Sequence, residues 1–254
     1  MKLFFRKFGE GEPIIILHGV FGSSDNWQTV AKRLAENYSV YVVDARNHGL
    51  SPHDDEFNYE AMSADLLELM DDQTIINPTL IGHSMGGKTV MTFASLHPDK
   101  IKQIVVVDIG PKYYPVHHEK IFEALFSIPL NDLLSRNDAE IKLAKLIPEI
   151  TTRQFLLKNL YRTADNKFAW RFNLLALRHH IGNIGISQLN NTPFSKPTLF
   201  IKGENSNYLP HDDWDSILIP FPKAVLCTVK NAGHWVHADN ADGFLECLEQ
   251  FLNR

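Results

Sequence analysis

Cysteine is scarce in this sequence, because Cys227 and Cys247 are the two examples in 254 residues. Small secreted proteins that depend on disulfide frameworks carry many more. Both cysteines stand in apolar surroundings, the first in a strand-like run and the second in a helix-like one. We therefore expect two buried thiols, as in a protein of the reducing cytoplasm, rather than a disulfide.

Long hydrophobic runs are missing as well. No stretch approaches the roughly 18–20 apolar residues that span a bilayer. Near the N-terminus the apolar run Leu3–Phe5 ends at Arg6, and such a run is too short for the hydrophobic region of a signal peptide. We expect a cytoplasmic protein with no stable membrane association.

Positive charge is in deficit, since 25 Lys and Arg residues stand against 30 Asp and Glu residues, giving a net charge of −5. Nucleic-acid binding needs a positive surface that displaces counterions from phosphate, so DNA and RNA are not expected partners. With 44% apolar and 22% charged residues, the composition is that of a globular protein. The expected partner is a small-molecule substrate, bound by a monomer or a homodimer.

Short apolar runs that end at Gly or Asp alternate with stretches of helical period. Most runs are nearly continuous in Val, Ile and Leu, which is typical of strands buried on both faces of a parallel sheet. The predicted strands are Leu3–Phe8, Ile14–Leu17, Val40–Val43, Thr79–Ile81, Ile104–Val107, Thr198–Ile201 and Val225–Val229. The predicted helices between them are 25–37, 59–72, 85–96 and 241–252. This order predicts an α/β fold with a mostly parallel central sheet and helices on both faces.

The alternation stops between Asp108 and Pro197, where helical patterning continues without a clear strand. The helical stretches in this segment are Glu119–Phe126, Ala139–Leu146, Thr152–Tyr161 and Trp170–His179. We expect a helical lid, residues 113–190, inserted between two segments of one core, residues 1–112 and 191–254. Because open α/β sheets bind ligands at the carboxyl edge, the lid is expected to cover that edge.

A Gly-x-Ser-x-Gly pattern, Gly82 to Gly86, follows the predicted strand 79–81 and leads into a predicted helix. The two glycines allow the chain to fold back sharply around a strained Ser84, whose hydroxyl then projects from the sheet edge. The N–H groups at the start of the helix favour an oxyanion nearby. A glycine-rich turn is the alternative, but the strand–turn–helix context favours Ser84 as a nucleophile.

An attacking serine needs a base, and a carboxylate must hold that base in the correct tautomer. Among the 12 histidines, His234 follows the last predicted strand at the same sheet edge as Ser84, and it is the predicted base. Asp108, which ends the predicted strand 104–107, is the predicted acid. The alternative carboxylates are Glu204 and either Asp212 or Asp213.

The loop after the predicted strand 14–17 is expected to give one N–H of an oxyanion hole, and Met85 the other. Both Val20 and Phe21 are open as the first donor, and Phe21 is also expected to wall the substrate pocket. Arg46 lies in a turn that we interpret mainly as structural, with an anionic group of the substrate as its alternative partner. No metal site is expected, since the histidine pairs 117/118 and 179/180 lack a cysteine or a suitably spaced carboxylate.

Together these motifs resemble the α/β-hydrolase superfamily over nearly the whole chain, and more narrowly the YbfF-type bacterial esterases. The narrower resemblance rests on His18-Gly19-Val20-Phe21-Gly22 with Asn26-Trp27, on Asp44-x-Arg46-Asn47-His48-Gly49-x-Ser51-Pro52, and on Gly82-His83-Ser84-Met85-Gly86-Gly87-Lys88. In many α/β hydrolases the acid stands three residues past the glycine that ends a late strand, where this chain has Ser206. The loop Gly203-x-x-Ser206-x-Tyr208 is similar to the version in the YbfF-type group, which has its acid at the position of Asp108.

The resemblance implies an α/β-hydrolase fold with a helical lid inserted after the sixth strand. It also implies hydrolysis of carboxylic esters, extending to acyl-CoA thioesters, through an acyl-enzyme on Ser84 and without a metal or organic cofactor. Two other functions are open. A carbon–carbon bond hydrolase would use the same triad, and a ligand-binding protein would keep the fold without catalysis.

Overall fold

The computed structural model describes residues 1–188 and 193–253. Seven strands form one central sheet in the order β1-β3-β2-β4-β5-β8-β9. Their bounds are β1 Phe5–Phe8, β2 Glu12–Leu17, β3 Tyr38–Val43, β4 Thr79–His83, β5 Gln103–Val107, β8 Thr198–Gly203 and β9 Ala224–Val229. Strand β1 pairs antiparallel with β3, whereas the other neighbouring strands are parallel. The predicted α/β class with a mostly parallel sheet is confirmed.

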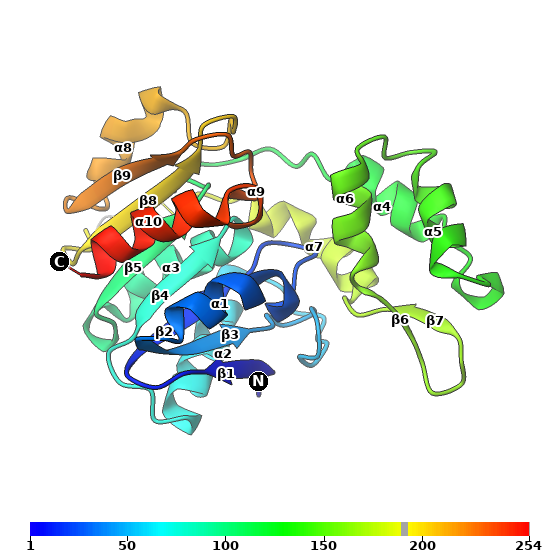
Figure 1. Ribbon diagram of the computed structural model, residues 1–254, viewed down its shortest axis with the longest axis horizontal. Helices are drawn as coiled ribbons and strands as arrows, with labels where there is room; N and C mark the ends of the chain where they lie inside the picture. Colours follow the sequence, from blue (N-terminus) through cyan, green and yellow to red (C-terminus); the bar gives the residue numbers. More distant parts are fainter. Residues whose placement is uncertain (189–192, 254) are drawn as a thin grey trace.

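Helices cover both faces of this sheet (Figure 1). One face packs against α2 (Tyr59–Asp72), α3 (Met85–Leu96) and α8 (Trp214–Leu218). The other packs against α1 (Gln28–Leu34), α9 (Val236–Asp239) and α10 (Ala241–Leu252). Successive side chains of a strand point to opposite faces, so Leu80 of β4 joins the first core and Ile81 joins the second. Both are fully buried, which explains why these strands are apolar without alternation.

A second lobe, the cap (residues 113–188), stands beside the carboxyl ends of the strands (Figure 1). Its elements are α4 (Glu119–Phe126), α5 (Arg136–Leu143), α6 (Ile150–Leu157), β6 (Leu160–Arg162), β7 (Phe168–Trp170) and α7 (Leu174–Ile184). Short 3-10 turns occur at Ser24–Trp27, Pro98–Lys100, Leu130–Asp132 and His211–Asp213. The hydrophobic cluster of the cap continues into the sheet domain through Phe21 and Tyr59. The cap therefore shares its core with the sheet domain.

Two expectations about the insertion are wrong. It follows the fifth strand of the chain rather than the sixth, because β1 to β5 precede it. It also contains the antiparallel pair β6–β7, whose strands are too short, at three residues each, to stand out against helical patterning. The expected boundary between residues 190 and 191 lies outside the described residues. Among the described residues, the structure contains no helix with the length and apolar character needed to span a bilayer.

The two cysteines form a disulfide, so the expectation of two free thiols is wrong. Strand β9 and helix α10 are neighbours, and their packing brings the Cα atoms of Cys227 and Cys247 to 6.1 Å. This separation lies within the range that a disulfide can bridge. The spacing of 20 positions along the chain does not reveal which faces of a strand and a helix will meet. The closed loop contains His234.

Reduction of this disulfide is expected to destabilise the protein without changing its chemistry. Opening a loop of this length costs about 3 kcal/mol of unfolding free energy, or roughly 6–12 °C in Tm for a chain of this size. Thermal unfolding with and without a reductant measures the effect, and a Cys227→Ala/Cys247→Ala variant is the control that should no longer respond to the reductant. Two titratable thiols in the unreduced native protein would contradict the pairing.

Candidate active site

Ser84 occupies the sharp turn between β4 and α3. Its backbone has φ 52° and ψ −112°, a conformation that costs a non-glycine residue about 1–3 kcal/mol. The turn requires glycine on both sides. A Cβ atom at Gly82 would collide with the Gly86 carbonyl, and one at Gly86 would collide with the Leu17 carbonyl. The hydroxyl of Ser84 is thereby presented at the carboxyl edge of the sheet.

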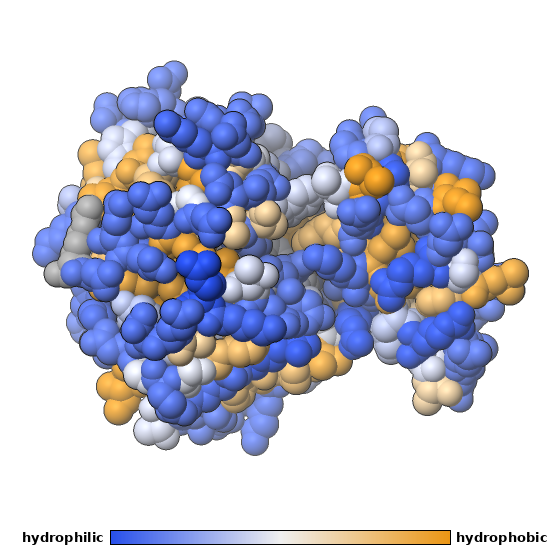
Figure 2. Space-filling view, viewed as in Figure 1, coloured by the Kyte–Doolittle hydropathy of each residue, from blue (hydrophilic) through white to orange (hydrophobic). Residues whose placement is uncertain are grey.

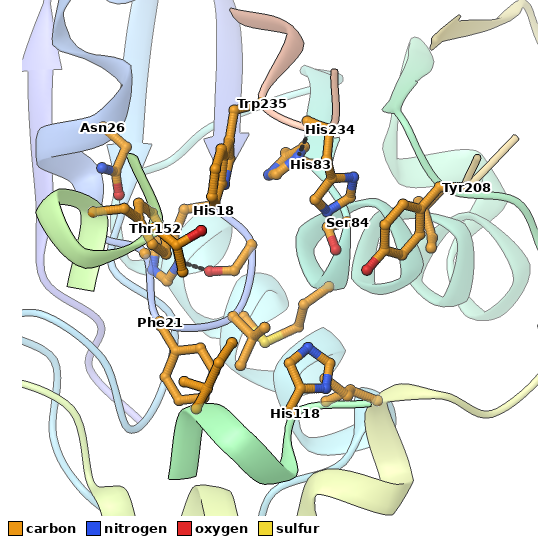
Figure 3. A pocket seen from close by; sticks show the side chains of 18 of the residues that line it. His18, Phe21, Asn26, His83, Ser84, His118, Thr152, Tyr208, His234 and Trp235 are labelled. Atoms are coloured by element: carbon orange, nitrogen blue, oxygen red, sulfur yellow. Dashed lines mark hydrogen bonds between the residues drawn. The ribbon is translucent and has the colours of Figure 1, made fainter. Parts of the chain in front are cut away.

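His234 and Asp108 lie next to this serine. Figure 3 shows the His234 ring beside the Ser84 hydroxyl, and His234 Nδ1 is 2.8 Å from Asp108 Oδ2. Because an ionised carboxylate only accepts hydrogen bonds, Nδ1 carries the proton and the lone pair of Nε2 is available to Ser84. The structure thus brings together the three residues predicted as nucleophile, base and acid.

The Asp108 carboxylate is fully buried and held from two further directions. Its Oδ1 accepts a hydrogen bond from the Gly203 N–H at 3.0 Å, and its Oδ2 accepts one from the Ser206 hydroxyl. Ser206 stands at the position where the resemblance to many α/β hydrolases would place the acid itself. In this chain that residue donates to a carboxylate from the neighbouring strand.

The other carboxylates considered from the sequence have different partners. Glu204 accepts a hydrogen bond from the Asn231 N–H at 3.0 Å. Asp213 forms an ion pair with Lys112 at 2.6 Å, and Asp212 is exposed. The His234 ring donates its hydrogen bond to Asp108.

The loop after β2 distinguishes Val20 from Phe21. The Phe21 N–H donates to His48 Nε2 at 3.2 Å, and His48 Nδ1 lies 2.9 Å from the Arg46 carbonyl. A carbonyl can only accept, so Nδ1–H of His48 is the donor and Nε2 is the acceptor for Phe21. The Phe21 N–H thus has a partner within the protein, which favours Val20 of the two expected donors. Met85 begins α3, where N–H groups lack an acceptor within the helix.

Arg46 does not reach the site. Its guanidinium makes a bidentate salt bridge to buried Asp65, with Nε–Oδ2 at 2.6 Å and Nη2–Oδ1 at 2.9 Å. A third hydrogen bond goes to the Glu56 carbonyl at 2.9 Å. The guanidinium is thus engaged inside the sheet domain, which is the structural role that the sequence favoured over a contact with an anionic substrate group.

Tyr208 and His83 hold His234 in place, and the sequence did not single out these contacts. The Tyr208 ring stacks on His234 with centroids 3.9 Å apart, and burial raises the pKa of Tyr208 to about 12. The hydroxyl of Tyr208 is 2.6 Å from His117 Nε2 of the cap. His83 Nε2–H donates to the His234 carbonyl at 2.8 Å. The position of the cap is therefore linked to the orientation of the candidate base.

Lys88 ties both ends of the cap to α3, the helix that follows Ser84. Its Nζ donates to the Lys112 carbonyl at 2.6 Å and to the Ile186 carbonyl at 2.5 Å. Burial lowers the pKa of Lys88 to about 7. A neutral amine still has two N–H donors, one for each carbonyl, so the attachment does not depend on the charge.

A cavity of about 450 Å³ lies between the cap and the sheet domain and includes Ser84 and His234 in its wall. Figure 2 shows a hollow between the two lobes, with apolar surface inside it. The apolar part of the lining includes Val20, Phe21, Met85, Ile109, Ile121, Phe155, Leu156 and Ile184. Phe21 is a wall residue, as expected, and packs edge-to-face on Phe122 of the cap at 5.4 Å. A cavity of this size and polarity suits a small apolar ligand.

Four buried histidines surround the site, and burial lowers the pKa of each. The pKa of His48 and that of His237 fall to about 3, and those of His18 and His83 are also lowered. In the unfolded chain a histidine titrates near 6.5. Between pH 6.5 and pH 3 the unfolded state therefore binds more protons than the folded state.

Acidification is expected to destabilise the protein over that window. The sign follows from proton linkage. Where unfolding takes up protons, the free energy of unfolding decreases as the pH is lowered. Between pH 7 and pH 5 the loss is roughly 2 kcal/mol for each of His48 and His237. Urea unfolding at the two pH values measures it. In a His237→Phe variant, which keeps a ring against Trp27, the pH dependence should be smaller; an unchanged dependence would contradict the explanation.

Comparison with known proteins agrees with the fold. Residues 12–241 match the family model described as the alpha/beta hydrolase fold. The esterase YbfF of Escherichia coli (strain K12) is 39% identical over 242 residues, which cover 95% of this chain and 93% of that protein. The chain belongs to the α/β-hydrolase family.

Two further relatives place this chain more narrowly within the α/β-hydrolase family. The sn-1-specific diacylglycerol lipase ABHD11 of Mus musculus is 40% identical over 247 residues, covering 94% of this chain and 80% of that protein. A solved structure described as a marine microorganism esterase matches with a TM-score of 0.96 at 42% identity, covering 99% of both chains. The α/β hydrolase is a YbfF-type enzyme of the esterase class.

Proposed function

We propose that Ser84, His234 and Asp108 form a catalytic triad that hydrolyses carboxylic esters. The observation that carries this proposal is the 2.8 Å hydrogen bond between His234 Nδ1 and Asp108 Oδ2, beside a serine on a strained strand-to-helix turn. The names of the relatives, an esterase and a diacylglycerol lipase, support the same reaction class.

The reaction begins when His234 Nε2 takes the proton of the Ser84 hydroxyl. The Ser84 oxygen then attacks the ester carbonyl, and the N–H groups of Val20 and Met85 stabilise the oxyanion. Asp108 stabilises the imidazolium that forms. His234 returns the proton to the departing alcohol oxygen, which leaves an acyl-enzyme on Ser84. A water molecule, deprotonated by His234, attacks the acyl-enzyme, and His234 then returns that proton to the Ser84 oxygen as the carboxylic acid leaves.

The substrates that we propose are esters with an apolar acyl group, and acyl-CoA thioesters as a second class. The apolar lining of the cavity supports the first. For the second, a cation is needed near the mouth of the cavity, and Arg46 is unavailable. Lys158, which is exposed and follows α6 on the cavity wall, is the cation we propose for an anionic thioester.

A substrate panel tests the proposal. We expect p-nitrophenyl esters of graded chain length to be hydrolysed with a higher kcat/KM than a vinylogous diketone, with acyl-CoAs measured in parallel. Preference for the diketone would instead indicate a carbon–carbon bond hydrolase, which needs the same triad. Absence of turnover on every substrate would favour a ligand-binding protein. A cytoplasmic location and a monomeric or homodimeric state remain predictions.

A further inference from the structure

His118 is a polar side chain in an otherwise apolar part of the cavity wall. It lies on the cap, directly before α4, and Figure 3 shows its ring projecting into the cavity near Phe21. In that view His118 lies on the opposite side of Ser84 from His234. The proposed mechanism gives this residue no role.

The two ring nitrogens of His118 have different surroundings. Within residues 1–188 and 193–253, Nδ1 is buried without a hydrogen-bond partner. The residue stands at the N-cap of α4, yet its side chain makes no capping hydrogen bond. A buried N–H without an acceptor costs more than an unpaired lone pair, so the proton is more stable on Nε2. Figure 3 shows one ring nitrogen directed across the cavity toward Ser84, and we assign it as Nε2.

The ring is uncharged and fixed in position. Burial, together with the neighbouring His117 and His234, lowers the pKa of His118 to about 4. The ring stacks on His117 with centroids 4.3 Å apart and faces the Phe21 ring at 6.1 Å. At neutral pH His118 therefore presents a single neutral N–H donor in an apolar surface. Few, well-placed polar groups of this kind orient a ligand in an apolar pocket.

The position of the donor determines which part of a substrate it meets. The departing alcohol must receive its proton from His234, so it lies on the His234 side of Ser84. The acyl group extends to the other side, where His118 stands. We propose that the Nε2–H of His118 donates a hydrogen bond to a carbonyl oxygen of the acyl group, so that the preferred acyl group carries a second carbonyl besides the scissile one.

This inference rests on the proposed ester hydrolysis and predicts a substrate preference. A plain hydrocarbon acyl group would displace water from the His118 Nε2–H and leave this donor without an acceptor. We therefore expect a lower kcat/KM for that substrate. The test compares ethyl esters in matched pairs: butanoate with 3-oxobutanoate, pentanoate with 4-oxopentanoate, and hexanoate with 5-oxohexanoate. Release of acid at constant pH gives kcat/KM for the wild type and for each variant.

Three variants separate the loss of the hydrogen-bond donor at position 118 from a change in the shape of the cavity wall. His118→Phe keeps a ring but removes the donor, His118→Gln keeps a donor, and His179→Phe changes an exposed cap histidine outside the cavity. For at least one pair, we expect His118→Phe to lose about tenfold in kcat/KM on the keto ester and little on the plain ester. His118→Gln should recover part of the loss, and His179→Phe should match the wild type.

Equal losses of His118→Phe on both members of every pair, or no loss at all, would overturn the proposal and leave His118 a wall residue. Failure of the proposed function has a different signature, since the wild type would then hydrolyse none of the six esters. Circular dichroism and Tm of each variant establish that it is folded. If His118→Phe does not fold, the proposal is decided on His118→Gln and on a His118→Asn variant by the same paired ratios.

Discussion

Replacement of Ser84 by alanine is expected to lower kcat for ester hydrolysis by about 10⁶-fold, the order of loss found when a triad serine is removed. The oxyanion donors and the cavity remain in Ser84→Ala, so a residual rate above the uncatalysed reaction should persist. The measurement is steady-state hydrolysis of a p-nitrophenyl ester, together with labelling by a fluorophosphonate probe.

Ser206→Ala is the matched control for probe labelling, because Ser206 donates to Asp108 and is not a nucleophile in the mechanism. We expect the probe to label the wild type and Ser206→Ala but not Ser84→Ala. Labelling of the wild type that persists in Ser84→Ala would place the nucleophile elsewhere, and an absence of labelling in the wild type would favour a non-catalytic binding protein.

The second large effect is expected for Asp108→Asn, with a loss of about 10⁴-fold in turnover. The amide keeps the volume of the carboxyl group but carries no negative charge to stabilise the imidazolium. Its NH₂ group donates and cannot accept, so the tautomer of His234 is no longer fixed. Initial rates across pH 6–9 on one ester give the comparison with the wild type.

Glu204→Gln is the control for this substitution. Its amide oxygen can still accept the hydrogen bond from the Asn231 N–H, so we expect turnover close to that of the wild type. If Glu204→Gln lost activity while Asp108→Asn kept it, the assignment of the acid would be wrong.

The sequence predicted the sheet because its central strands are buried on both faces and read as continuous Val, Ile and Leu. The same approach located helices 59–72, 85–96 and 241–252 at the bounds that the structure has. It missed β6 and β7, because three residues are too few to establish a period. The bounds of α5, α6 and α7 shifted by a few residues, since the packing inside the cap decides where these helices end.

The candidate site was predictable where the chemistry lies in a local motif or at a strand end, as for Ser84 and Asp108. Contacts between distant segments were not predictable. The hydrogen bond from Tyr208 to His117 joins residues 91 positions apart, and the one from Ser206 to Asp108 joins residues 98 positions apart. Arg46 is the opposite case. It stands in a motif that suggested a binding role, but its guanidinium pairs with Asp65 inside the sheet domain.

Ser84 and Asp108 share one backbone feature, a φ of 52° at the ends of adjacent parallel strands. Glycine adopts this conformation without the strain that a side chain imposes. At Asp108 the buried carboxylate accepts three hydrogen bonds that glycine would leave without an acceptor, so relief of strain should favour glycine at Ser84 alone. A library selected for thermal resistance alone should therefore enrich glycine at Ser84, and every such variant would lack the nucleophile of the proposed triad. Selection for turnover is then what retains the strained serine, and the ratio of glycine to serine in the two kinds of selection would measure the opposition between stability and activity at this turn.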